Sequence, residues 1–242
     1  MNILVLTGAG ISAESGIPTF RDADGLWEGH RFEDVATPEA FARDPATVHR
    51  FYNERRKTLQ QDSIQPNSAH LALAEFETWA VAAGHSFLLV TQNIDNLHAR
   101  AGSQNVLHMH GELMKVSCLY SGDTFDWDGD LSVDTPHPDH LDDDSKRGLL
   151  RPHVVWFGEM PLGMSKIERA AGQARLFVSI GTSALVYPAA GIIHWTPAEC
   201  RRVELNLQTT QGTDAFDQSI QGPASRVVPQ FFNGLMNGSE TP

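Results

Sequence analysis

Four short apolar runs constrain the fold of this chain more than any other feature of its sequence. They read "NILVLTG" (2–8), "FLLVTQN" (87–93), "LFVSIGTS" (176–183) and "RVELNLQ" (202–208). Each is rich in Val, Ile or Leu, as strands buried on both faces of a parallel sheet are. The runs predict an α/β fold. Because open α/β sheets bind ligands at the carboxyl ends of their strands, we expect the site residues there.

The segments between and around these runs divide into two kinds. Residues 67–84, "NSAHLALAEFETWAVAAG", predict a helix that stops at Gly84. Residues from about 30 to 66 also look helical, since "TPEAF" and "DPATV" place a capping residue before Pro. Residues from about 113 to 150 carry scattered Asp, Gly, Pro and His with little periodicity, and "DDD" at 142–144 is interpreted as a solvated loop.

We interpret the last two regions as insertions that form a smaller lobe. The expected organisation is one domain over 1–242, with a large lobe of about 1–30, 67–112 and 165–242 and a small lobe of about 31–66 and 113–164.

Composition excludes several classes of protein. The 242 residues are 41% hydrophobic and 20% charged, as in globular proteins, and the net charge of -12 argues against a nucleic-acid partner. No apolar run approaches the length of a membrane span. Strand-like sequence follows Met1 almost at once, so no cleavable signal is expected. Two cysteines, Cys118 and Cys200, are too few for a disulfide framework, which favours a cytoplasmic location.

The stretch "GAGISAESGIPTFRD" (8–22) follows the first apolar run. A strand, glycines and a helix start suggest a phosphate-binding turn. The dinucleotide fingerprint is incomplete, however, because its third glycine would fall at Ala13 and the next glycine is Gly16. The closing "PTFRD" is not required by an ordinary nucleotide loop and suggests a lid.

Two further segments carry polar groups near strand ends. "TQNID" (91–95) supplies Asn93 and Asp95, which serve either a ligand site or an Asx turn. "VLHMHGEL" (106–113) supplies His108 and His110, and strand periodicity places both on one face with Met109 opposite. An H-x-H pair is also half of a metal site in metal-dependent amidohydrolases, and spacing alone does not choose between the two histidines.

The chain resembles the sirtuins, the NAD-dependent protein lysine deacylases, over nearly its whole length. The matching segments, in order, are "GAGISAESGIPTFR", "TQNIDNLH", "HMHGE", "VVWFGE", "IGTS" and "NL". The subgroup it resembles is the bacterial CobB-type, related to the animal desuccinylases (class III). The resemblance implies a Rossmann-like parallel sheet with helices on both faces, and an inserted lobe made of a helical insertion and a reduced zinc-ribbon-like module.

The resemblance also implies how NAD binds as a co-substrate. The turn from Gly8 would cradle the pyrophosphate with helix N-terminal amides facing the anion, and residues 18–27 would form a mobile lid. Asn93 and Asp95 would line the nicotinamide pocket. The implied NAD-binding residues are Gly8, Ala9, Gly10, Ser12, Phe20, Arg21, Trp27, Gln92, Asn93, Ile94, Asp95, Gly181, Thr182, Ser183, Asn206, Leu207, Gln208 and Ala224.

The implied reaction is attack of the acyl-amide oxygen on the ribose carbon as nicotinamide departs, after which a histidine base removes a ribose hydroxyl proton. The family's base is the His before Gly, which is His110 here, and an imidazole titrates in the range that this task needs. "VVWFGE" (154–159) and "LVYP" (185–188) would clamp an extended substrate as added strands. The implied contacts are Val155, Phe157, Gly158, Glu159 and Tyr187.

The helix predicted over "DPATVHRFYNERRKTLQ" (44–60) carries a cation on its apolar stripe. Val48, Phe51, Tyr52 and Leu59 form the stripe, and Arg55 falls near its middle, whereas Arg56 lies roughly 80° from the stripe's centre. Arg55 either snorkels or pairs with a core carboxylate, or else it awaits a substrate carboxylate together with Tyr52. The Y-x-x-R pair resembles the one that lines the acyl pocket of desuccinylating sirtuins, which implies removal of succinyl, malonyl and acetyl groups.

The sequence departs from the sirtuin pattern at two places. The usual four zinc-binding cysteines are missing, and only Cys118 lies in that region, with His137 and His140 as weak further candidates. We therefore expect zinc to be absent or atypical. Gln208 stands where relatives often have Glu, which removes the charge that would repel a 2′-phosphate and makes selectivity against NADP less secure.

Several functions remain open at this stage. The first is a deacylase acting on acylated lysine side chains of proteins, with no nucleic-acid or membrane partner. A protein ADP-ribosyltransferase and a non-catalytic NAD or ADP-ribose sensor would use the same pocket. A metal amidohydrolase built on H-x-H is the weakest rival because it leaves the glycine loop unexplained.

Overall fold

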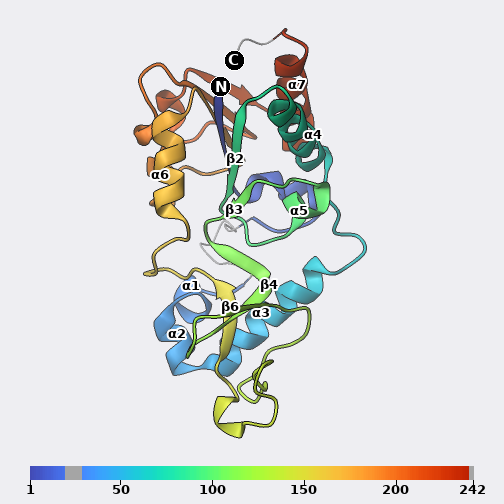
Figure 1. Ribbon diagram of the computed structural model, residues 1–242, viewed down its shortest axis with the longest axis vertical. Helices are drawn as coiled ribbons and strands as arrows, with labels where there is room; N and C mark the ends of the chain where they lie inside the picture. The colour runs from blue at the N-terminus through green and yellow to red at the C-terminus, as the bar shows by residue number, and fades with distance from the viewer. Residues whose placement is uncertain (20–28, 240–242) are drawn as a thin grey trace.

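The computed structural model describes residues 1–19 and 29–239 and has the predicted α/β architecture (Figure 1). Its main sheet has six strands in the order β3-β2-β1-β7-β8-β9, and every neighbouring pair is parallel. The strands are β1 (Asn2–Thr7), β2 (Ser86–Thr91), β3 (Val106–His108), β7 (Leu176–Ile180), β8 (Arg201–Asn206) and β9 (Gln218–Gln221). The four apolar runs of the sequence supply β1, β2, β7 and β8, as predicted.

Helices cover both faces of this sheet because its central strands are apolar on both sides. Ile3 and Val5 of β1 pack into one core, and Leu4 and Leu6 pack into the other. The first core lies under α4 (Ser68–Ala82) and α7 (Ala224–Met236), with α5 (Leu97–Ala101) beside α4. The second lies under α6 (Met164–Gln173) and η4 (Ala189–Trp195), and Figure 1 shows α6 across the sheet from α4 and α7.

A second lobe is built from the two predicted insertions. Its helices are α1 (Phe32–Val35), α2 (Pro38–Arg43) and α3 (Pro45–Leu59), and its antiparallel sheet has the order β5-β4-β6. The strands are β4 (Gly111–Cys118), β5 (Thr124–Asp126) and β6 (Leu150–Val154). The predicted caps are confirmed, since Thr37 accepts from the amide of Ala40 and Asp44 accepts from that of Thr47, each before a helix that opens with Pro.

Two local predictions are wrong. The strand expected through residues 106–110 ends at His108, and Met109 and His110 form a turn into β4. Gly111 makes the switch possible: its φ is 84°, and a Cβ there would lie 2.1 Å from the carbonyl oxygen of His153. The glycine loop leads into two short 3-10 turns rather than directly into an α-helix.

Those turns are η1 (Ala9–Ile11) and η2 (Ala13–Ser15), and the remaining 3-10 turns are η3 (Asp144–Lys146) and η5 (Thr213–Ala215). Within the described ranges, no helix combines the length and apolar character needed to cross a bilayer.

The small lobe encloses a buried histidine. His49 of α3 is 2% exposed, and its ring packs edge-on against Phe41 at 5.2 Å. Within the described part of the chain, neither ring nitrogen has a partner. Burial, and then the charge of Arg56, lowers the pKa of His49 to about 4. His70 under the main sheet has its pKa lowered to about 4 by burial.

These histidines predict a loss of stability in acid. A pKa that is lower in the folded state gives stability that is complete above the unfolded value of 6.5 and is lost as pH falls from there toward 4. The loss should approach about 1.4 kcal/mol per pH unit for each histidine. His49→Leu should be at least as stable as wild type at pH 7.5 and should lose less stability by pH 5. Urea unfolding at both pH values measures this, and an unchanged pH dependence in the variant would contradict it.

Candidate functional site

The carboxyl ends of the main strands and the inner side of the small lobe line one cavity of about 1210 Å³. All the predicted NAD-binding residues that the structure describes line it: Gly8, Ala9, Gly10, Ser12, Gln92, Asn93, Ile94, Asp95, Gly181, Thr182, Ser183, Asn206, Leu207, Gln208 and Ala224. So do His110, Tyr52, Arg55, Val155, Phe157, Gly158, Glu159 and Tyr187. The remaining predicted residues, Phe20, Arg21 and Trp27, lie outside the described residues.

The cavity's floor depends on glycine. A Cβ on Gly8 would lie 2.8 Å from the carbonyl oxygen of Gly181, and one on Gly10 would lie 2.7 Å from the Cα of Gly181. The amides of Gly8 and Gly10 donate to the carbonyls of Ile180 and Gly181, at 2.9 Å and 2.8 Å. Those two N–H groups therefore join the ends of β1 and β7 and do not face an anion. The glycines serve packing of the loops as much as access for a ligand.

Side-chain amides join the remaining strand ends. Gln92 Nε2 donates to Thr182 Oγ1 at 3.1 Å, and Asn206 Nδ2 donates to the carbonyl of Thr182 at 2.7 Å. Asn93 Nδ2 donates to the carbonyl of Gly8 at 3.1 Å. The loops after β1, β2, β7 and β8 thus form one hydrogen-bonded rim.

A buried polar network lies beside this rim. Ser12 Oγ donates to Asp95 Oδ2 at 2.9 Å and accepts from Asn93 Nδ2 at 3.1 Å. His70 Nδ1 accepts from the amide of Asn67, so its Nε2 carries the proton toward Ser12 Oγ, 3.4 Å away. This is the neutral tautomer, in agreement with the lowered pKa of His70. Burial raises the pKa of Asp95 although Ser12 donates to it.

The two candidate histidines differ in access to the cavity. His110 Nδ1 lies 3.0 Å from the carbonyl oxygen of Gln92, and His108 Nδ1 lies 3.4 Å from that of Asn93. Only His110 lines the cavity. Burial lowers the pKa of His110, opposed by its hydrogen bond to Gln92. A neutral ring that donates from Nδ1 leaves Nε2 as a proton acceptor, which is what a general base needs.

Tyr52 and Arg55 of α3 line the same cavity from the small lobe. Tyr52 is fully buried. Its hydroxyl oxygen accepts a hydrogen bond from Trp156 Nε1 at 2.9 Å, so the hydroxyl group can act as a donor to another group. Burial raises the pKa of Tyr52, which keeps it protonated. Arg55 is 8% exposed, its guanidinium carbon lies 3.2 Å from the centre of the Phe51 ring, and Nη1 donates to the Phe51 carbonyl.

Arg56 lies off the apolar stripe of α3 and is buried as well. Arg56 is 1% exposed, more buried than Arg55, because the segment 128–131 covers a second face of α3. Periodicity detects apolar stripes only, so a face that is covered through polar contacts escapes it.

The predicted substrate segments are turns rather than strands. β6 ends at Val154, and residues 155–159 form a turn that Glu159 closes, since its carboxylate accepts from the amide of Trp156 at 2.8 Å and pairs with Arg151 at 2.6 Å. Residues 185–188 are likewise outside any strand. Whether a substrate adds strands here stays a prediction.

The sequence analysis did not identify several residues that support the site. Glu204 of β8 is 1% exposed and accepts from Thr210, Thr213 and Ser219 at 2.7, 2.7 and 2.8 Å, which holds the loop that brings residues 207–211 to the cavity. The sequence did contain a signal for Glu204, because it is a charged residue between Val203 and Leu205 in an apolar strand. His70 and Trp156 gave no comparable signal, because Ser12 and Tyr52, which they contact in the site, are distant in sequence.

Comparisons with known proteins agree with this geometry. The model of the Sir2 family matches residues 8–188. The chain belongs to the Sir2 family. A relative from Rhodopirellula baltica, named NAD-dependent protein deacylase, is 64% identical over 96% of this chain and 98% of its own length.

Solved Sir2 structures share the fold over nearly the whole chain. A crystal structure of a Sir2 homologue–NAD complex has a TM-score of 0.84 at 38% identity, covering 98% of this chain and 90% of that one. A Sir2–p53 peptide–NAD+ complex has a TM-score of 0.74 at 28% identity, covering 98% and 92%.

The weak metal candidates do not form a site in this Sir2 chain. The rings of His137 and His140 lie 5.0 Å apart, but His137 Nδ1 accepts from the amide of Asp139, and Cys118 Sγ accepts from the amides of Tyr120 and Ser121. Among the residues that the structure describes, no group of three or more His, Cys, Asp or Glu side chains could hold a metal ion. The lobe has its own small core of Val116, Cys118, Leu131 and Leu150.

Removing metal should therefore leave the protein folded. A structural zinc contributes its binding energy to folding, so a zinc-dependent lobe unfolds when a chelator removes the ion. We expect EDTA to change the melting temperature by less than about 2 °C, below the effect of 1 kcal/mol in a domain of this size. Elemental analysis of the untreated protein is the control. Stoichiometric zinc, lost together with a large drop in melting temperature, would contradict the prediction.

Proposed function

We propose that this chain is an NAD-dependent protein deacylase that removes acetyl, succinyl and malonyl groups from lysine side chains, releasing nicotinamide and O-acyl-ADP-ribose. The observation that carries the proposal is that one cavity is lined by the glycine loops, by His110 and by the Tyr52–Arg55 pair. The proposal includes a single catalytic domain, divided into two lobes at the boundaries that the sequence predicts.

The lining suits the proposed co-substrate. The hydroxyl and amide groups of Thr182, Ser183 and Asn206 line the cavity and fit ribose and phosphate oxygens. NAD, when bound, supplies the ribose carbon that accepts the acyl oxygen as nicotinamide leaves. Asp95 and Asn93 would orient the carboxamide, and His110 Nε2 would accept the ribose hydroxyl proton.

The acyl end of the cavity suits a carboxylate. A guanidinium fork binds a carboxylate through two bonds, and the Tyr52 hydroxyl adds a third donor, so a succinyl or malonyl group would meet Arg55 and Tyr52. An acetyl group has no carboxylate and needs only the apolar lining.

A panel of acetyl-, succinyl- and malonyl-lysine peptides, each with and without NAD, tests the proposal. Formation of nicotinamide and O-acyl-ADP-ribose together supports a deacylase. Nicotinamide release with ADP-ribose attached to protein would favour a transferase, and NAD binding without release would favour a sensor. Acyl release without NAD would favour a hydrolase.

His110→Ala should abolish deacylation while NAD still binds. Loss of a positioned base costs about a hundredfold or more in kcat, and the variant removes no group from the rim loops. Turnover is measured with acetyl peptide, and NAD binding is measured by calorimetry. His108→Ala is the matched control, because His108 bonds to the neighbouring carbonyl but does not line the cavity. Wild-type turnover in His110→Ala would rule out the assigned role.

Arg55→Met should impair desuccinylation selectively. A hydrogen bond to a charged group contributes roughly 1.5–3 kcal/mol, so kcat/KM for succinyl peptide should fall at least about tenfold while that for acetyl peptide changes little. Arg50→Met is the matched control, since Arg50 is an exposed arginine of the same helix bonded to Thr47. Equal losses on both peptides would argue against a carboxylate site at Arg55.

A further inference from the structure

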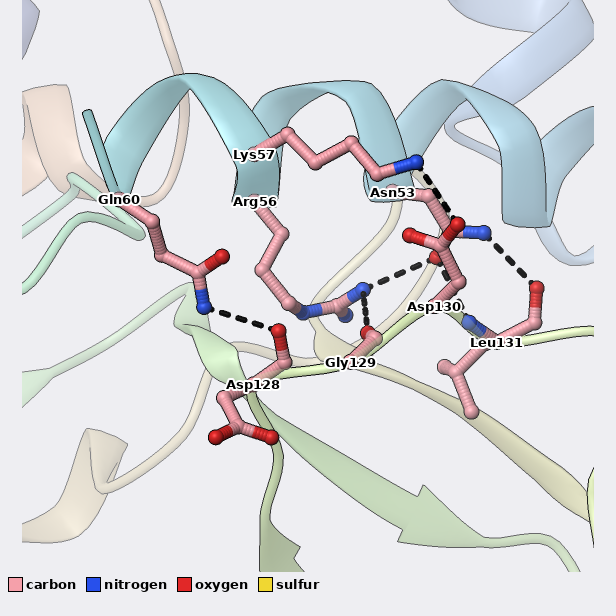
Figure 2. Close-up of polar contacts among 8 residues, drawn as sticks. All are labelled: Asn53, Arg56, Lys57, Gln60, Asp128, Gly129, Asp130 and Leu131. Atoms are coloured by element: carbon pink, nitrogen blue, oxygen red, sulfur yellow. Dashed lines mark hydrogen bonds and ion pairs between the residues drawn. The ribbon is translucent and has the colours of Figure 1, made fainter.

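The face of α3 that turns away from the cavity carries a row of polar side chains. Asn53, Arg56, Lys57 and Gln60 are spaced i, i+3, i+4 and i+7, so they share one face of the helix. Figure 2 shows that all four reach the segment 128–131, and we call these four residues the α3 clamp.

The clamp contacts each residue of this segment. Asn53 forms a two-way pair with Leu131: its Nδ2 donates to the Leu131 carbonyl at 2.8 Å, and the Leu131 amide donates to its Oδ1 at 2.9 Å. Gln60 Nε2 donates to the Asp128 carbonyl at 2.8 Å, and Lys57 pairs with Asp130 at 2.7 Å. The contacts of Lys57 and Gln60 are exposed, so they contribute little.

Arg56 is the centre of the clamp. Its Nε donates to the carbonyl of Leu113 in β4 at 3.1 Å, and its Nη1 donates to Asn53 Oδ1 at 3.0 Å and to the Gly129 carbonyl at 3.1 Å. Among the described residues, no carboxylate lies within ion-pair distance of Arg56 and its Nη2 has no hydrogen-bond partner. A buried cation held by directional bonds, with the charges of Asp128 and Asp130 acting on it, is costly to displace, because any shift leaves it with fewer partners.

The clamp and the acyl end of the cavity lie next to each other in the chain. Tyr52 and Arg55 directly precede Asn53 and Arg56, so about 100° of helix rotation separates the two pairs. A rotation of α3 by about 20° would move a side chain at a radius of about 5–6 Å by roughly 2 Å. Hydrogen bonds to a substrate carboxylate span only about 2.7–3.2 Å, so such a movement would break them.

We infer that Arg56 is a positioning residue for the acyl pocket: by tying α3 to Leu113, Gly129 and Asn53, it fixes the rotation of the helix and thereby holds Tyr52 and Arg55 in the cavity. The choice of a succinyl group as the ligand rests on the proposed function, but the positioning of Tyr52 does not.

The test compares Arg56→Met with wild type by two readouts. The first is the ratio of kcat/KM for succinyl and acetyl peptides. We expect this ratio to fall at least about tenfold, through KM for the succinyl peptide, because charged hydrogen bonds are lost. The second is hydrogen exchange of the Trp156 indole N–H, followed by NMR. This group is buried and donates to Tyr52, so its exchange should quicken at least about tenfold when Tyr52 moves.

Matched variants separate positioning from general damage. Arg50→Met should leave both readouts unchanged, and Arg56→Lys should restore them in part because it keeps the charge and one donor. If Arg56→Met does not fold, the same two readouts are measured for Arg56→Lys and Asn53→Ala. Asn53→Ala removes both hydrogen bonds to Leu131. Equal losses on both peptides, or an unchanged ratio together with unchanged indole exchange in a folded variant, would overturn the inference.

Failure of the proposed function looks different. If wild type does not remove succinyl groups, or if Arg55→Met leaves the ratio unchanged, the carboxylate site is wrong. The indole exchange of the Arg56 variants still reports on the position of Tyr52 in that case. Unchanged exchange then overturns the positioning role by itself.

Discussion

The candidate site depends on a backbone contact that only glycine permits. The loops after β1 and β7 approach so closely that a Cβ on Gly10 would lie within 2.7 Å of the Gly181 Cα. This contact brings the carboxyl ends of two central strands into register, and Gln92, Asn93 and Asn206 then add side-chain bonds from neighbouring strand ends. Any larger residue would separate the loops and open the floor of the cavity.

Around this floor burial shifts the pKa values of several ionisable groups. His70 and His110 have lowered pKa values and Asp95 a raised one, in each case chiefly because burial penalises the charged form. A neutral His70 fixes the direction of the bonds through Ser12, and a neutral His110 keeps one ring nitrogen as a base. The same burial that tunes these groups makes the fold sensitive to acid.

Helix α3 connects the small lobe to the site, and two of its faces make different contacts. One face carries Tyr52 and Arg55 to the cavity, and the other holds the segment 128–131 by Asn53 and Arg56. That segment has little regular structure of its own, so polar bonds from α3 and the small apolar core that includes Leu131 hold it in place.

The sequence alone determined the α/β class, four of the six parallel strands, the caps of α2 and α3, and the residues that gather at the strand ends. Buried strands are largely apolar and parallel strands share one carboxyl edge, so local patterns suffice for these features. Only the tertiary structure decided that His110 sits in a turn beside the Gln92 carbonyl, that Glu204 anchors the loop reaching the cavity, and that Arg56 is buried. Each of these rests on polar contacts, which apolar periodicity does not record. The partners of His110 and Arg56 are also distant in the sequence, as in the separation of 73 positions between Arg56 and Gly129.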